Sequence, residues 1–422
     1  MRLDLRSFIL AVAVTALIPA SGGAQQPAAG TSRSSDEQRC TGQAGVRPDA
    51  QAAACTALID SGRFTRQNLA ILHSNRGIAY GKGGDYDRAI ADFDAALRIN
   101  PNHVRAYLNR GNANFARGDY DRAISDFGNA IRLEPRNVAI VMSRATAYEA
   151  KGDFGRAIAD YDQALKLDPN FTAAMNSRGN AWRRNGNLDR AIADFDQVIR
   201  LNPKDVAAYN NRAMALTDRR DFDRAAADYD QAIKLDPRYA PSYLNRGLLW
   251  QAKKDYDRAV ADFDQAIRLA PDNAAAANAR GFIFDLKGEF DRAMADFDRA
   301  IALEPKNPTY YNNRGNSWRD RGRFDRAVED YDKAIELSPS FAFAFYNRSQ
   351  AHYLAGRFNE ALVDAAKAAA LNENAQALSL RGLIQEKLGA RDAAIADLRR
   401  AASLDPGFSQ AVDALRRMGV PQ

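Results

Sequence analysis

Hydrophobic residues recur along most of this chain with the period of an amphipathic helix. In one clear segment, Ala123, Phe127, Ala130 and Ile131 occupy positions i, i+4, i+7 and i+8. That spacing places all four on a single apolar stripe of an α-helix. Pro135 follows soon after and ends the helix, because proline cannot continue it.

A second, more polar helix is predicted just before this one. Tyr107, Gly111 and Asn114 share one of its faces, and residues 117–119 read Arg-Gly-Asp, which is typical of a turn. Gly111 and Ala123 are small, so the two helices can approach each other closely. The segment therefore predicts a helix-turn-helix unit.

The same unit is repeated along the chain. Prolines occur every 34 residues, at Pro101, Pro135, Pro169, Pro203, Pro237, Pro271, Pro305 and Pro339. Arginines keep the same step, at Arg76, Arg110, Arg144, Arg178, Arg212, Arg246, Arg280, Arg314 and Arg348. A tenth, Arg381, comes after 33 residues, so one residue is missing near residues 373–377. A fixed period of this length is the signature of a repeat architecture.

These units resemble the tetratricopeptide repeat. They share its 34-residue period, its Gly, Ala, aromatic, Ala and Pro slots, and the wording Asn-Arg-Gly followed by Gly-Asp-Tyr-Asp-Arg-Ala-Ile-Ala-Asp-Phe. The resemblance covers residues 70–408 in ten repeats. It implies an all-α fold, a right-handed α-solenoid superhelix of helix-turn-helix repeats, whose concave face is lined by the first helix of each repeat. Residues 49–69 are expected to form an N-terminal capping helix region, and residues 409–422 a C-terminal capping helix.

The repeats depart from the family pattern at a few slots. The glycine between the helices is replaced at Ala145, Ala213 and Ser349, the turn glycine at Arg220 and Lys254, and the aromatic residue at Ala365 and Leu398.

The repeated arginine of each unit occupies a position where the family usually has an apolar residue. An aspartate follows each arginine by 16 residues, at Asp92, Asp126, Asp160, Asp194, Asp228, Asp262, Asp296, Asp330, Asp364 and Asp397. This spacing places the aspartate on the facing helix of the same repeat, where a guanidinium can bind a carboxylate through two hydrogen bonds. We interpret the column as a ladder of structural ion pairs. The alternative is a basic stripe that binds an anionic partner.

The N-terminus has the features of a signal peptide. Arg2 and Arg6 precede an apolar run at residues 8–18, and small residues lead to Ala24. The run is shorter than the about 20 residues that span a bilayer. We expect residues 1–24 to be a cleaved signal peptide and residues 25–48 a low-complexity linker, with an uncleaved anchor as the alternative. The mature protein would then be periplasmic or secreted and would have no membrane span.

The chain has two cysteines, Cys40 and Cys55, both before the repeats. In an oxidising compartment they are expected to form one disulfide, whose loop would stabilise the fold by about 3 kcal/mol in the chain-entropy model. Two free thiols in a reducing cytosol are the alternative.

Charge and composition argue against several functions. The formal net charge is +6 over 422 residues, which is too dilute to indicate a nucleic-acid partner. The three histidines, His73, His103 and His352, are far apart in a stack where each repeat contacts only its neighbours. We therefore expect no metal site, no cofactor and no catalytic group, and the protein is not predicted to be an enzyme.

The side chains that vary between otherwise similar repeats are the candidate ligand contacts. We call the following set the first-helix track: Asn112, Phe115, Asn176, Asn180, Arg183, Asn210, Asn278, Phe282, Asn312, Asn316, Arg319, Tyr346 and Tyr353. Its asparagines can donate to and accept from the backbone of an extended peptide, although they would also suit a merely hydrated helix face. The predicted function is a scaffold that binds a protein or peptide. The alternative is an accessory of envelope or cell-wall assembly that binds glycan through asparagine, tyrosine, Trp182 and Trp318.

Overall fold

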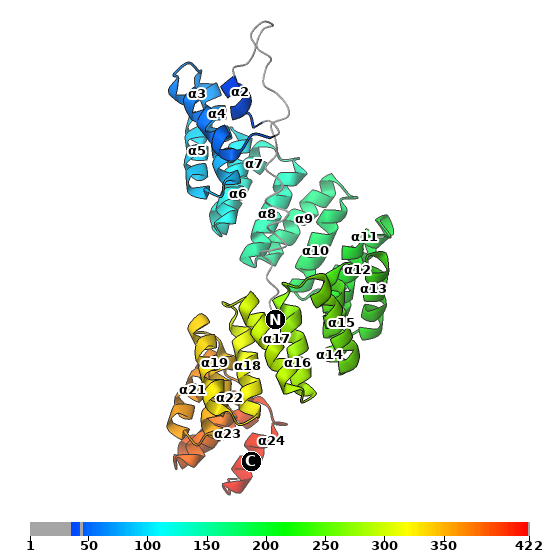
Figure 1. The fold of residues 1–422 in the computed structure, drawn as a ribbon, viewed down its shortest axis with the longest axis vertical. Coiled ribbons are helices and arrows are strands. Elements are labelled where there is room, and N and C mark those ends of the chain that lie inside the picture. The colour runs from blue at the N-terminus through cyan, green and yellow to red at the C-terminus, as the bar shows by residue number, and fades with distance from the viewer. Residues whose placement is uncertain (1–34, 43–44, 421–422) are drawn as a thin grey trace. The chain divides into compact units, whose positions relative to one another are not determined.

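The computed structural model describes residues 35–42 and 45–420, and every regular element in these residues is a helix (Figure 1). The expected all-α repeat solenoid is confirmed in this part of the chain. The first helices of the ten repeats are α4 (Arg66–Lys82), α6 (Val104–Ala116), α8 (Val138–Lys151), α10 (Thr172–Arg184), α12 (Val206–Asp218), α14 (Ala240–Ala252), α16 (Ala274–Leu286), α18 (Pro308–Asp320), α20 (Ala342–Leu354) and α22 (Ala375–Lys387). The second helices are α5 (Tyr86–Ile99), α7 (Tyr120–Leu133), α9 (Phe154–Leu167), α11 (Leu188–Leu201), α13 (Phe222–Leu235), α15 (Tyr256–Leu269), α17 (Phe290–Leu303), α19 (Phe324–Leu337), α21 (Phe358–Leu371) and α23 (Arg391–Leu404).

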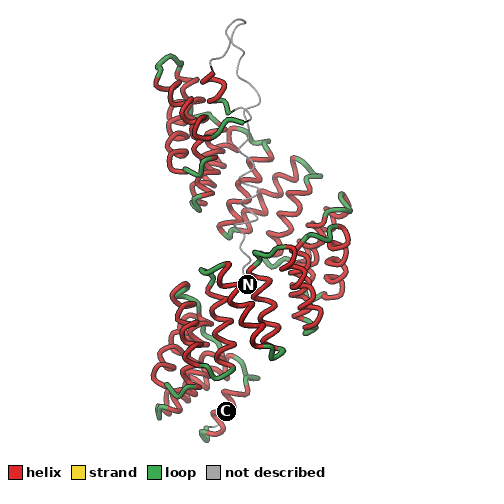
Figure 2. The backbone as a smooth tube through the Cα atoms, viewed as in Figure 1, coloured by secondary structure: helices red, strands yellow, loops and turns green. Residues whose placement is uncertain are grey.

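The chain divides into two compact bodies, Met1–Ala225 and Ala226–Gln422, and the division lies within α13. We call them the first body and the second body. Within each body, consecutive helices pack against one another and are joined by short loops (Figure 2). No helix in the described part of the chain is both long and apolar enough to cross a bilayer.

The two helices of one repeat meet at a glycine and an aromatic ring. A Cβ atom at Gly111 would lie 2.6 Å from Cε1 of Phe127, so no larger residue fits there without movement. The ninth repeat exchanges both partners, because Ser349 replaces the glycine and Ala365 replaces the ring. Both are fully buried, and the Ser349 hydroxyl donates to the carbonyl oxygen of Ala361 at 2.8 Å.

The turn between the two helices requires a left-handed backbone, which glycine supplies in most repeats. Two repeats have a side chain there instead: Arg220 has φ 65° and Lys254 has φ 60°. Such angles are unfavourable for residues with a Cβ atom. The two substitutions noted in the sequence therefore carry backbone strain.

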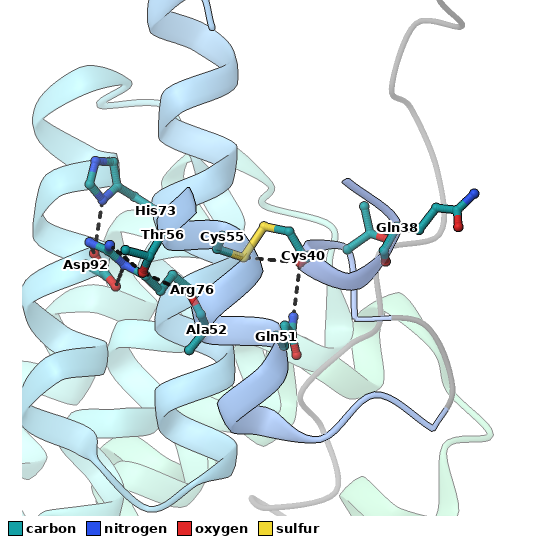
Figure 3. Close-up of a disulfide and its surroundings, with 10 residues drawn as sticks. Gln38, Cys40, Gln51, Ala52, Cys55, Thr56, His73, Arg76 and Asp92 are labelled. Atoms are coloured by element: carbon teal, nitrogen blue, oxygen red, sulfur yellow. Dashed lines mark hydrogen bonds and ion pairs between the residues drawn. A yellow bond between two sulfur atoms is a disulfide. The ribbon is translucent and has the colours of Figure 1, made fainter. Parts of the chain in front are cut away.

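The N-terminal end of the stack is covered by α2 (Ser35–Cys40) and α3 (Pro48–Asp60). The expected disulfide between Cys40 and Cys55 is present, with an S–S distance of 2.04 Å, and both cysteines are buried (Figure 3). The helix α2 lies within the segment expected to be a linker, and the bridge explains why it is ordered there. The predicted signal peptide lies outside the described residues.

The last helix, α24 (Ser409–Arg417), packs on α23 through Ala411, Ala414 and Leu415. Its end residues Ser409, Gln410, Arg416 and Arg417 are exposed, which suits the end of a stack.

Candidate binding surface

The arginine column forms the ion pairs that its spacing predicts. Arg280 is representative: its Nε donates to Oδ2 of Asp296 at 2.8 Å and its Nη2 donates to Oδ1 at 2.7 Å. The same pairing joins Arg76 to Asp92, Arg110 to Asp126, Arg144 to Asp160, Arg178 to Asp194, Arg246 to Asp262, Arg314 to Asp330, Arg348 to Asp364 and Arg381 to Asp397. Arg212 belongs to the first body and Asp228 to the second, so that tenth pair stays a prediction.

These pairs are largely removed from solvent. The side chain of Asp296 is 6% exposed and that of Arg280 is 20% exposed. The hydrogen bonds that Arg280 donates to Asp296 raise the pKa of Arg280 above the ordinary arginine value, although burial acts in the opposite direction. The guanidinium groups of these nine arginines are therefore held inside the repeats. They do not form the free basic stripe that was the alternative interpretation.

A second aspartate, which the sequence analysis did not assign, joins seven of the ten arginines to the preceding repeat. Nη1 of Arg280 also donates to Oδ1 of Asp264 at 2.6 Å, and Asp264 lies on α15 of the preceding repeat. The same bridge joins Arg110 to Asp94, Arg178 to Asp162, Arg212 to Asp196, Arg246 to Asp230, Arg314 to Asp298 and Arg348 to Asp332. One guanidinium therefore connects two successive repeats. The signal was the repeated wording Asp-aromatic-Asp, whose second aspartate is Gly128 in the second repeat and Ala366 in the ninth.

The first repeat extends this network to the cap. Arg76 Nη1 donates to the hydroxyl of Thr56 on α3 at 3.0 Å, and His73 Nδ1 lies 3.0 Å from Oδ1 of Asp92 (Figure 3). These contacts give His73 a structural role. Within the described residues, no group of three histidine, cysteine or acidic side chains is placed to hold a metal ion.

In the first body, the track asparagines differ in whether their side-chain amides have hydrogen-bond partners. Asn112 and Asn180 are partly buried, and their side-chain amides have no hydrogen-bond partner among the described residues. Oδ1 of Asn176 is buried and also lacks a partner. By contrast, Asn210 is 4% exposed, and its amide contacts the sulfur of Met214 at 3.6 Å. The free amides are therefore concentrated on α6 and α10.

Two further track residues of the first body have internal contacts. Phe115 packs against the ring of Tyr120, with ring centres 5.4 Å apart. Nη1 of Arg183 donates to Asp218 at 2.6 Å, while its buried Nε has no partner. Arg183 is thus held on α10 with one donor unused.

In the second body, two track asparagines accept hydrogen bonds from asparagines of the following repeat. Asn313 Nδ2 donates to Asn278 Oδ1 at 2.9 Å, and Asn347 Nδ2 donates to Asn312 Oδ1 at the same distance. Asn278 and Asn312 are buried. Their acceptors are used inside the stack, so these two positions join first helices rather than present open amides.

The remaining track residues of the second body line α16, α18 and α20. Asn316 accepts from the hydroxyl of Tyr331 at 2.8 Å, and Arg319 donates to Gln350 at 2.8 Å. The hydroxyl of Tyr346 accepts from Gln350, and Tyr353 packs edge-on against the ring of Phe358. Phe282 is exposed.

A partly buried acid lies on α8 of the first body. Glu149 on α8 accepts from the Tyr161 hydroxyl at 2.8 Å. Burial raises the pKa of Glu149, and the hydrogen bond and the charge of Arg184 only partly offset it. Burial and the nearby Glu149 charge likewise raise the pKa of Tyr161.

The two tryptophans proposed as sugar platforms are covered by other parts of the chain. The guanidinium of Arg190 lies over the ring of Trp182, 4.6 Å from its centre. The ring of Trp318 contacts Phe290 edge-on at 5.2 Å. Neither arrangement favours stacking of a sugar on these rings.

Comparison with known families gives matches along most of the described chain. A tetratricopeptide-repeat model matches residues 75–139, 142–206, 177–240, 210–274 and 244–308. Two further tetratricopeptide-repeat models match residues 308–341 and 375–408. Among curated proteins, none matches this sequence significantly.

Solved structures share the fold at low sequence identity. A tetratricopeptide repeat protein from Parabacteroides merdae is 24% identical, with a TM-score of 0.51 over 56% of this chain and 94% of its own. A chain of the APC/C hetero-tetramer Cut9-Hcn1 is 13% identical, with a TM-score of 0.52 over 88% and 93%. Yeast Tom70 is 18% identical, with a TM-score of 0.50 over 98% and 95%. At these identities the likeness describes the fold.

Proposed function

Because the chain belongs to the tetratricopeptide-repeat family, we propose that it is an exported scaffold that binds a protein or peptide segment along its first helices. The proposed contacts are the track residues whose polar groups are not used internally. Repeats of this kind form extended surfaces suited to a partner chain. The proposal assigns the molecule no catalytic step and no cofactor.

The observation that carries the proposal is the set of unpaired amides on the first helices α6 and α10. Most buried polar groups in proteins have hydrogen-bond partners, and an unpaired one is costly. Oδ1 of Asn176 is buried without a partner, and the amides of Asn112 and Asn180 are free. The backbone N–H and C=O groups of an extended segment supply what these side chains lack.

Export is supported by the disulfide. A buried bridge between Cys40 and Cys55 is typical of proteins that fold in an oxidising compartment. The apolar segment at residues 8–18 provides the expected signal. We therefore propose a periplasmic or secreted location for the mature chain.

Site-specific photocrosslinking in the native host tests the binding surface. A photoreactive residue at position 112 or 180 should capture a protein partner, because both positions lie among the free amides. The matched control is position 193, where Ala193 is exposed on the second helix α11. Crosslinks from position 193 that equal those from positions 112 and 180 would contradict the proposal, as would the absence of crosslinks from both track positions.

A further inference from the structure

The missing residue between the ninth and tenth repeats changes the local surface. Four residues separate α5 from α6, but only three, residues 372–374, separate α21 from α22. The proline that follows the second helix in the earlier repeats is replaced by Glu373. Asn374 caps the shortened connection, because its Oδ1 accepts from the backbone N–H of Ala377 at 2.9 Å.

A pocket of about 380 Å³ lies at this junction. It is lined by Ala342, Phe343, Tyr346, Asn347, Ala368, Asn372, Asn374, Gln376 and Ala377. The pocket contains one track residue, Tyr346, and adjoins the internal amide pair between Asn347 and Asn312. It therefore places one track residue of the second body at an open pocket.

The lining is apolar and uncharged. Alanine side chains and the rings of Phe343 and Tyr346 provide most of it, and no acidic or basic side chain contributes. Phe343 is 62% exposed, which is unusual for a phenylalanine, and its ring contacts Phe341 edge-on at 6.2 Å. An aromatic side chain left in water at a concave site is a marker of a binding surface.

Polar groups at the rim match a peptide backbone. The side-chain amides of Asn372 and Gln376 are exposed and have no hydrogen-bond partner among the described residues. Each amide offers a donor and an acceptor, which is what one peptide unit requires.

We propose that this pocket binds one uncharged aromatic or branched aliphatic side chain of an extended partner segment, with Asn372 and Gln376 hydrogen-bonding the adjoining backbone. The inference rests on the proposed function and assigns it a side-chain preference. A lysine or glutamate side chain is excluded because its charge would be desolvated without a counter-ion.

Titration of the mature chain with capped tripeptides tests this pocket. The probes are N-acetyl-Gly-X-Gly-amides with X as phenylalanine, leucine, lysine or glutamate, together with maltotriose, and binding is followed by methyl NMR of alanine-labelled protein. The variant is Phe343→Ala, and the matched control is Leu286→Ala, since Leu286 is also an exposed apolar residue on a first helix and is not part of the first-helix track.

The phenylalanine and leucine probes should bind at least roughly tenfold more tightly than the charged probes. Phe343→Ala should weaken them roughly tenfold through the loss of apolar contact, and Leu286→Ala should leave them unchanged. Equal binding of all four peptides, equal effects of the two variants, or maltotriose binding that depends on Phe343 would each overturn the inference.

The same variant separates this inference from the proposed function. If position 112 or 180 captures a partner and Phe343→Ala does not weaken that partner's affinity, the scaffold stands and the pocket preference is wrong. If the tripeptides bind as expected and neither track position captures a partner, the pocket stands as an apolar side-chain site and the proposed scaffold surface is wrong.

Discussion

The guanidinium of Arg280 binds the carboxylate of Asp296 through two hydrogen bonds of 2.8 and 2.7 Å. The arginine lies on the first helix of its repeat and the aspartate on the second. The third contact of the same guanidinium reaches Asp264 in the preceding repeat. The ladder therefore fixes both the packing within a repeat and the step between repeats.

Removing one partner of this pair should destabilise the second body. Arg280→Leu leaves Asp296 buried without its counter-ion, and breaking such a pair costs about 3–5 kcal/mol. Combining it with Asp296→Leu should recover much of the loss, since apolar replacement of a buried pair is often close to neutral. A double-mutant cycle from denaturant unfolding measures the coupling. A coupling no larger than that of an exposed pair, about 0.2–1 kcal/mol, would contradict the structural role.

The bridge to the preceding repeat can be tested where the chain lacks it. Gly128 occupies the slot of the second aspartate, and its Cβ would lie 3.8 Å from Nη1 of Arg144. Gly128→Asp should therefore stabilise the first body by more than Gly128→Asn, whose uncharged side chain has the same size and a similarly low helix propensity. Thermal unfolding of the two variants gives the comparison. The aspartate would be partly exposed, so its additional gain should be below about 1 kcal/mol. A less stable aspartate variant would reject the bridge.

The repeat period made most of the fold predictable. The hydrogen-bond partners of the track residues were only partly predictable. The spacing of Arg280 and Asp296 identified their pairing, because both slots recur in register. The burial of Asn278 and Asn312 was not predictable, because it depends on pairing with asparagines of the following repeat. These partners lie 35 residues later, one position beyond the 34-residue period. The helix α2 was missed because a short segment held by a disulfide has no periodic pattern of its own.

The strained turn of the sixth repeat offers a stabilising substitution. Lys254 has φ 60°, where a Cβ atom costs roughly 1–2 kcal/mol and glycine costs little. Lys254→Gly should raise the free energy of unfolding by about 1 kcal/mol. Gly288→Ala, at the equivalent turn with φ 76°, is the reverse control and should lower it. Circular dichroism melts would show the two effects with opposite signs, and a loss of stability in Lys254→Gly would refute this account.

The partly buried acid Glu149 on α8 should make stability depend on pH. The folded protein holds the proton of Glu149 more tightly than the unfolded chain, because burial raises the pKa of this carboxyl. Its ionisation at neutral pH therefore costs stability, and that cost is removed as pH falls through the folded pKa. Glu149→Gln should be more stable than the wild type at neutral pH, and the difference should shrink toward about pH 4.3, the ordinary range of glutamate. A constant difference between Glu149→Gln and the wild type across this range would contradict the prediction.

The disulfide should stabilise the cap without holding the stack together. In the mature chain, thiol titration after denaturation without reductant should find no free cysteine, and two free thiols would reject the bridge. The bridge joins α2 to α3, whereas α3 is also held by Leu58 against Leu72 and by the hydrogen bond from Arg76 to Thr56.

Replacing both cysteines by alanine should therefore expose α2 to hydrogen exchange and leave most of the protection of α3. The repeats beyond it should keep theirs, because each depends mainly on its neighbours. The global cost should stay below the about 3 kcal/mol expected for a loop of this length, since α2 contributes only a short helix to the core. Simultaneous loss of hydrogen-exchange protection in α2, α3 and α4 would instead show that the bridge anchors the whole N-terminal end. In that case, Thr56→Ala in the oxidised protein would be expected to leave the protection of α3 unchanged.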